Sequence, residues 1–175
     1  QAYRGSTAAD QSAEEALQEA ARNERDRMLY VIDALHEAGI KAVLANSSDH
    51  PFEISIGSTP SLRYFENATS KHGYRITEIR PGNYVFHDAI QTSIGAATMS
   101  ECALTVQATV ISKHRNADGS ERLFLDAGKK VFTSDTGSHT KGHGIILYNS
   151  RKMHPLPHAV ITGLSEEHGW VRVRG

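Results

Sequence analysis

Two stretches decide the fold of this chain: Ile54–Ser61, which reads Ile-Ser-Ile-Gly-Ser-Thr-Pro-Ser, and Arg80–Tyr84, which reads Arg-Pro-Gly-Asn-Tyr. In the first, isoleucines alternate with a serine, which predicts a strand that ends at Gly57. Thr59 can cap a following helix, and Pro60 suits its first position. Because N–H groups at a helix start carry partial positive charge, this turn is suited to binding an anion.

The second stretch follows another expected strand, at 74–79. Gly82 lets the backbone approach a ligand closely, so the amide of Asn83 could reach it. Two such turns after successive strands are typical of a barrel that binds a phosphate after its last two strands. The predicted phosphate ligands are Gly57, Ser58, Thr59, Gly82 and Asn83. The alternative is an ordinary strand-to-helix turn followed by a Pro-Gly turn at a domain boundary.

The first eighty residues alternate helix and strand. Residues 12–38 have helical spacing of apolar side chains, and Ser12 with Glu15 has the spacing of a capping box. Gly39 supplies a left-handed stop. The shorter elements expected here are a strand at 41–45 and a helix at 60–67. This alternation predicts parallel βα units, and hence an α/β part over residues 1–84.

The second part of the chain has a different pattern. Asn116–Gly119 reads as a hairpin turn. Strands are expected at 83–87, 102–112, 122–127, 144–148, 159–164 and 170–173. No helix as strong as the first one is evident, so residues 85–175 are predicted to form an antiparallel β domain. Cys102 and Trp170 are expected in its core.

Composition excludes several classes of protein. A net charge of −1 over 175 residues gives no indication of a nucleic-acid or membrane partner. The single cysteine, Cys102, cannot form an internal disulfide and is compatible with a reducing compartment. No membrane-length apolar run or signal peptide is evident, so a cytoplasmic protein is expected. His139 and His143 have metal spacing only on a helix, which Gly142 and Gly144 disfavour.

Six blocks, taken in order, resemble the D-threonine aldolase and D-serine dehydratase family: Gly57–Pro60, Glu78–Asp88, Cys102–Val106, Asp126–Gly128, Ser134–Asp135 and Leu164–Gly169. The resemblance implies a pyridoxal-phosphate enzyme with an alanine-racemase-like fold, in which a TIM-type barrel precedes a β domain. By this resemblance the chain is a C-terminal half that starts at barrel strand six. Its two phosphate turns then follow strands seven and eight.

The resemblance also implies roles for single residues. Tyr3, in a block similar to the aldolase branch, would lie beside the cofactor. Arg80 could approach the cofactor ring nitrogen, but we prefer an exposed arginine. The lysine that binds the cofactor is expected before Gln1. The ligands of a divalent metal, zinc or manganese, are expected after Gly175. No catalytic residue or metal ligand is therefore expected within the chain. His168 and its neighbouring glutamates would at most orient the metal ligands or the start of a strand.

The implied activity is that of a lyase acting on D-3-hydroxy amino acids, as a homodimer. Gln1–Ser6 favours D-threonine aldolase-like cleavage to glycine and an aldehyde. The alternatives are a D-serine dehydratase-like ammonia-lyase and a binding or scaffolding remnant of the same fold without catalytic activity. A barrel enzyme for a phosphorylated sugar is disfavoured, because it explains neither Glu78–Asp88 nor the β domain.

Overall fold

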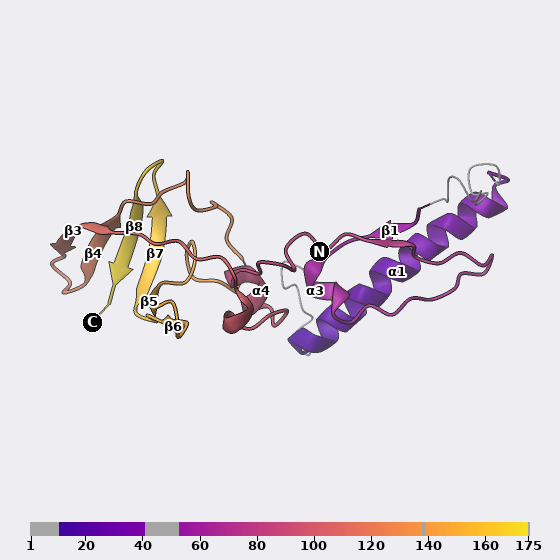
Figure 1. Ribbon diagram of the computed structural model, residues 1–175, viewed down its shortest axis with the longest axis horizontal. Coiled ribbons are helices and arrows are strands. Elements are labelled where there is room, and N and C mark those ends of the chain that lie inside the picture. The colour runs from indigo at the N-terminus through magenta and orange to yellow at the C-terminus, as the bar shows by residue number, and fades with distance from the viewer. Residues whose placement is uncertain (1–10, 41–52, 138, 175) are drawn as a thin grey trace. The chain divides into compact units, whose positions relative to one another are not determined.

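The computed structural model describes residues 11–40, 53–137 and 139–174. The chain divides into two compact units, Gln1–Tyr84 and Val85–Gly175 (Figure 1). Tyr3 and the strand expected at 41–45 lie outside the described residues.

Helix α1 (Ala13–Glu37) forms the first unit's longest element. The predicted capping box is confirmed: the Glu15 amide donates to Ser12 Oγ (3.2 Å), and the Ser12 amide donates to Glu15 Oε2 (2.9 Å). The hydrogen bonds that Glu15 Oε2 accepts from the Ser12 amide and from the Ser12 hydroxyl (2.8 Å) lower the pKa of Glu15. Gly39 ends the helix with φ of 81°, as predicted.

Strands β1 (Ser55–Ile56) and β2 (Glu78–Ile79) are parallel, with Ser55 opposite Glu78 and Ile56 opposite Ile79. In Figure 1, β1 lies along α1. Strand β2 is much shorter than the predicted 74–79. The reason is that the Asn67 side chain bonds both backbone groups of Ile76, taking the place of a neighbouring strand. The buried core of this unit is Leu29, Ile32, Ile54, Ile56 and Ile76.

Helix α3 (Thr59–Leu62) is a single turn, shorter than the predicted 60–67. Ser58 stands at its N-cap, one residue earlier than expected, and makes no capping hydrogen bond through its side chain. The helix ends early because the amides of Tyr64 and Phe65 bond carbonyls three residues back, which tightens the chain.

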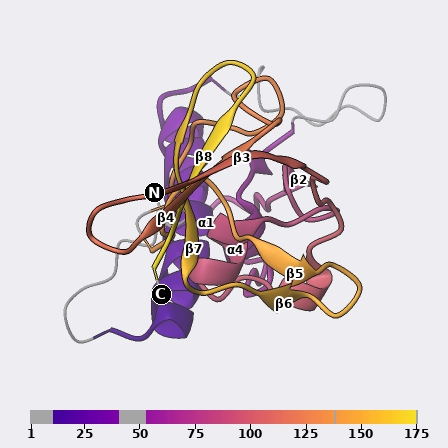
Figure 2. The same cartoon turned by 90° about the vertical axis from the view of Figure 1, so that its left-hand side faces the viewer.

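The second unit contains a four-stranded antiparallel sheet in the order β3 (Val110–Arg115), β4 (Glu121–Leu125), β8 (Gly169–Val173), β7 (Ala159–Leu164) (Figure 1). Asn116–Gly119 forms the predicted hairpin turn: the Asn116 amide donates to the Ser120 carbonyl at 2.8 Å. Strands β5 (Leu147–Asn149) and β6 (His154–Pro155) pair separately (Figure 2). The antiparallel prediction for this part is confirmed.

Several details of the second unit differ from prediction. Residues 83–87 are a turn, because Asp88 caps helix α4 (Ala89–Ser93) by accepting from the Gln91 amide at 2.8 Å. The strand expected at 102–112 starts only at Val110, after a short 3-10 helix at Met99–Glu101. The first strand of this unit is therefore shifted toward the hairpin.

The expected core positions also need correction. Trp170 is 46% exposed, because the pleat of β8 turns Val171 inward instead. Cys102 is half-buried, and burial raises the pKa of its thiol. Within the described ranges, no helix has the length and apolarity that a membrane crossing requires.

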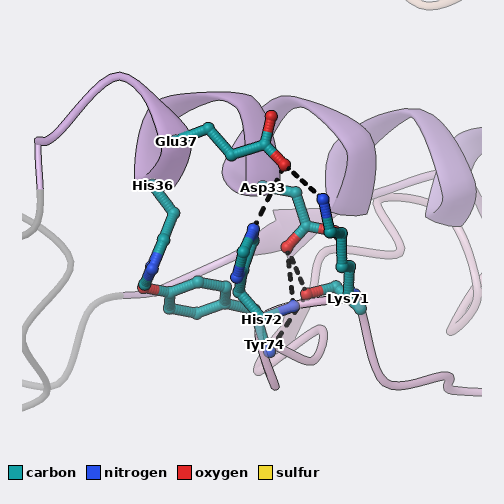
Figure 3. Close-up of polar contacts among 7 residues, drawn as sticks. Asp33, His36, Glu37, Lys71, His72 and Tyr74 are labelled. Carbon is teal, nitrogen blue, oxygen red and sulfur yellow. Dashed lines mark hydrogen bonds and ion pairs between the residues drawn. The ribbon is translucent and has the colours of Figure 1, made fainter.

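A polar clasp, which we define as Asp33, Glu37, Ser70, Lys71 and His72, joins the end of α1 to the turn at 70–74 (Figure 3). Asp33 accepts from the Ser70 hydroxyl at 2.7 Å and from the Lys71 amide at 3.0 Å. Glu37 accepts from Lys71 Nζ at 2.8 Å. The clasp thus ties two segments almost forty residues apart.

We expect the polar clasp to make stability depend on pH. Burial acts to raise the pKa of Asp33, but hydrogen bonds from Ser70, His72 and Lys71 outweigh it and lower that pKa. A carboxyl with a depressed folded pKa stabilises the fold above its ordinary value of about 4 and loses that contribution as the pH falls through the folded pKa. Asp33→Ala should cost about 1 kcal/mol at neutral pH after solvent screening.

Urea unfolding of the wild type and Asp33→Ala at about pH 7 and about pH 3 checks this expectation. The difference in stability between the two proteins should shrink at the lower pH. An equal difference at both values would contradict it.

Gly128→Ala is expected to destabilise the second unit. A Cβ there would lie 2.4 Å from the Ser165 carbonyl oxygen and 2.5 Å from the His168 amide, both backbone atoms. Such overpacking costs about 2 kcal/mol or more. Gly82→Ala is the control, because nothing lies within 4 Å of its Cβ position. Thermal unfolding should show a lowered Tm for the first variant only; equal Tm values would contradict the expectation.

Candidate functional site

The two predicted turns lie together. Since β1 and β2 are parallel neighbours, the turns that follow them lie at the same edge of the pair. The amide of Asn83 donates to Thr59 Oγ1 at 2.9 Å, and the amide of Arg80 donates to the Ile56 carbonyl at 2.8 Å. The structure thus brings Gly57–Thr59 next to Arg80–Asn83.

The close contact between the two turns requires a glycine at position 57. A Cβ at Gly57 would lie only 2.8 Å from the Arg80 carbonyl oxygen. Its amide, one of the predicted phosphate donors, instead donates to Glu24 Oε1 at 3.0 Å. The absence of a side chain at Gly57 therefore lets the two backbones approach, while its N–H is already engaged by α1.

Two hydroxyl groups remain suited to a ligand. Ser58 Oγ is buried and has no hydrogen-bond partner within the described part of the chain, which is a costly state for a polar atom. Thr59 Oγ1 accepts the Asn83 amide, so its own hydrogen can be donated elsewhere. The Cβ position of Gly82 points into open space. Ser58, Thr59 and the backbone at Gly82 therefore fit a phosphate group.

The Arg80 side chain is exposed, in agreement with the interpretation that we preferred. Its Nε donates to Ser55 Oγ, which keeps the guanidinium beside the first residue of β1. No phosphate or cofactor ring contact is needed to explain its position.

Glu166, Glu167 and His168 form the turn that leads into β8. The Ser165 amide donates to the His168 carbonyl at 2.9 Å, and the His168 amide donates to Ser165 Oγ at 3.2 Å. Glu167 forms an ion pair with Lys130, whose hydrogen bond lowers the pKa of Glu167. These contacts fit the predicted role of orienting the start of a strand. A role of His168 beside metal ligands stays a prediction.

The histidines within the described residues are not grouped as a metal site. Within residues 11–40, 53–137 and 139–174, no group of three or more His, Cys, Asp or Glu side chains is placed to bind a metal ion. His36 and His72 stack with ring centroids 4.2 Å apart and planes 9° apart. Because the nitrogen lone pairs of stacked rings point in parallel directions, the two cannot converge on one ion.

Glu24 is the residue of this site that the sequence analysis missed. It lies on α1, 33 residues before Gly57, and its partner is a backbone amide. No motif marks such a contact. The nearest sequence signal is that Leu17, Ala21 and Glu24 share one helical face, of which the first two are buried.

Comparisons with known proteins identify relatives of this chain. Residues 103–175 match the family described as "Putative serine dehydratase domain". The chain is 32% identical to D-threo-3-hydroxyaspartate dehydratase of Delftia sp. (strain HT23) over 159 residues, 89% of this chain and 37% of that protein. It is 35% identical to D-serine dehydratase of Dictyostelium discoideum over 85 residues, 48% of this chain and 20% of that protein.

Solved structures give the same assignment. An alanine-racemase-like protein from Idiomarina loihiensis has a TM-score of 0.72 at 26% identity, covering 99% of this chain and 41% of that one. D-threo-3-hydroxyaspartate dehydratase has a TM-score of 0.65 at 31% identity, covering 90% and 38%. The chain spans about two fifths of the length of these relatives. The resemblance to the D-threonine aldolase and D-serine dehydratase family, with its alanine-racemase-like fold, is confirmed.

Proposed function

We propose that the protein is a pyridoxal-phosphate-dependent dehydratase of D-3-hydroxy amino acids, in which this chain supplies phosphate-binding turns. The relatives from Delftia sp. and Dictyostelium discoideum are dehydratases, so they support the alternative interpretation and give no support to the expected aldolase cleavage. The proposed reaction removes the Cα proton and the β-hydroxyl as water, and hydrolysis of the imine form of the resulting enamine by a water molecule yields a 2-oxo acid and ammonia. The first unit is proposed to be the end of a TIM-type barrel.

One observation carries the proposal: the Asn83 amide lies 2.9 Å from Thr59 Oγ1, at the shared edge of two parallel strands. This contact occupies one of the two lone pairs of Thr59 Oγ1 and leaves the hydroxyl hydrogen for donation to a ligand. Beside it, the buried Ser58 hydroxyl has no hydrogen-bond partner among the described residues. A phosphate oxygen can satisfy both hydroxyls.

The coenzyme, when bound, withdraws electrons from the substrate Cα. Ser58 and Thr59 would hold its phosphate, Gly82 would leave room for it, and Tyr3 is proposed beside the ring. The residues that the structure describes offer no metal site, so a divalent metal, zinc or manganese, would need other ligands. A structure of a variant of the Delftia enzyme is described as a metal-free form. A cytoplasmic homodimer is part of the same proposal.

The phosphate turns are tested by comparing pyridoxal phosphate with pyridoxal, which lacks the phosphate. Ser58→Ala and Thr59→Val in the full-length protein should each weaken binding of pyridoxal phosphate about tenfold or more, since each removes a hydrogen bond to a charged group. Binding of pyridoxal should stay within about twofold. Thr59→Ser, which keeps the hydroxyl, is the control. Equal losses for both compounds would contradict the assignment.

Gly82→Ala probes the open space at the second turn. Because its Cβ meets nothing within 4 Å, the fold should keep its Tm. The added methyl group should nevertheless weaken binding of pyridoxal phosphate about tenfold, since it would occupy the proposed ligand space. Isothermal titration calorimetry measures the affinity. Unchanged affinity would place the phosphate elsewhere.

The reaction class is tested on the full-length protein with pyridoxal phosphate and a divalent metal. We expect the protein to release ammonia and a 2-oxo acid from D-serine or D-threo-3-hydroxyaspartate. Mass spectrometry detects these products. Release of glycine and acetaldehyde from D-threonine, without ammonia, would restore the aldolase interpretation and overturn this one.

A further inference from the structure

We infer that Glu24 is a positioning residue, which fixes the phosphate-binding turn from helix α1 without touching the ligand. The inference deepens the proposed function and rests on it. Glu24 Oε1 accepts from the Gly57 amide at 3.0 Å, and Glu24 Oε2 accepts from the Ser61 hydroxyl at 3.1 Å. One planar carboxylate therefore holds both ends of the turn that carries Ser58 and Thr59.

The far end of this turn is rigid. Ser61 is only 2% exposed, and its hydroxyl also lies 3.3 Å from the Ser58 carbonyl oxygen. The Ser61 hydroxyl thus joins Glu24 to the backbone of Ser58, whose own Oγ is buried without a hydrogen-bond partner in the described chain. A shift of Glu24 would therefore also shift the Ser58 hydroxyl.

Helix α1 keeps Glu24 in place. Ala21 and Leu17, one and two turns before it on the same face, are 3% exposed each. The next residue, Arg25, donates from Nη1 to the Glu66 carbonyl at 2.7 Å, just beyond α3. The rotation of the helix is therefore fixed on both sides of Glu24.

The negative charge of Glu24 disfavours a direct contact with the phosphate. A carboxylate repels a phosphate, and the Gly57 amide that an anion could use is occupied by it. Glu24 can therefore favour phosphate binding only by holding the turn in position. The opposing view is that Glu24 competes with the phosphate for this amide, and the two views predict opposite changes in affinity when Glu24 is shortened.

Glu24→Gln separates geometry from charge. Its amide oxygen can accept from Gly57, and its Nε2 can donate to the Ser61 hydroxyl, which then donates to the Ser58 carbonyl. This variant should bind pyridoxal phosphate as tightly as the wild type or tighter. Glu24→Ala should bind it about tenfold more weakly, with pyridoxal unchanged within about twofold. Arg22→Ala, an exposed change on the same helix, is the control.

The experiment measures both affinities in the full-length protein, and hydrogen exchange of the Gly57 amide without coenzyme. The inference predicts faster exchange in Glu24→Ala and near-normal exchange in Glu24→Gln. Unchanged exchange in Glu24→Ala, or tighter binding of pyridoxal phosphate by that variant, would overturn it. A wild type that does not prefer pyridoxal phosphate over pyridoxal would overturn the proposed function, whereas the exchange result would still decide whether Glu24 holds the turn.

Discussion

The parallel pairing of two very short strands is the constraint on which the site depends. With Ser55 opposite Glu78 and Ile56 opposite Ile79, the chain must turn at Gly57 and at Arg80 on the same edge. The contact between these turns is so close that a Cβ at Gly57 would meet the Arg80 carbonyl. The buried isoleucines at 54 and 56 fix which way the first strand faces, and so which way its turn opens.

Helix α1 contacts the region around β1 and β2 at several positions along its length. Its apolar face packs Leu29 and Ile32 against Ile54, Ile56 and Ile76, and Glu24 accepts a hydrogen bond from the turn after β1. The polar clasp at its end fixes the residues that precede β2. Helix packing, a carboxylate and the strand register therefore converge on one small region. Such convergence holds hydroxyl groups ready for a ligand before it binds.

The sequence predicted those features that depend on neighbouring residues. The capping box at Ser12, the stop at Gly39 and the hairpin at Asn116–Gly119 are local, and all three are present. Features decided by distant contacts were missed. The Asn67 side chain shortens β2, and Glu24 takes the Gly57 amide. Trp170 is more exposed than its apolar character suggested, because the strand pleat, and not hydrophobicity alone, selects the inward side chain.

The central claim is that the turns at Gly57–Thr59 and Arg80–Asn83 together bind the phosphate of pyridoxal phosphate. A crystal structure of the full-length protein with the coenzyme tests it most directly. The account predicts phosphate oxygens within hydrogen-bond distance of Ser58 Oγ and Thr59 Oγ1, with Glu24 still bonded to the Gly57 amide. A phosphate bound away from both turns would contradict it.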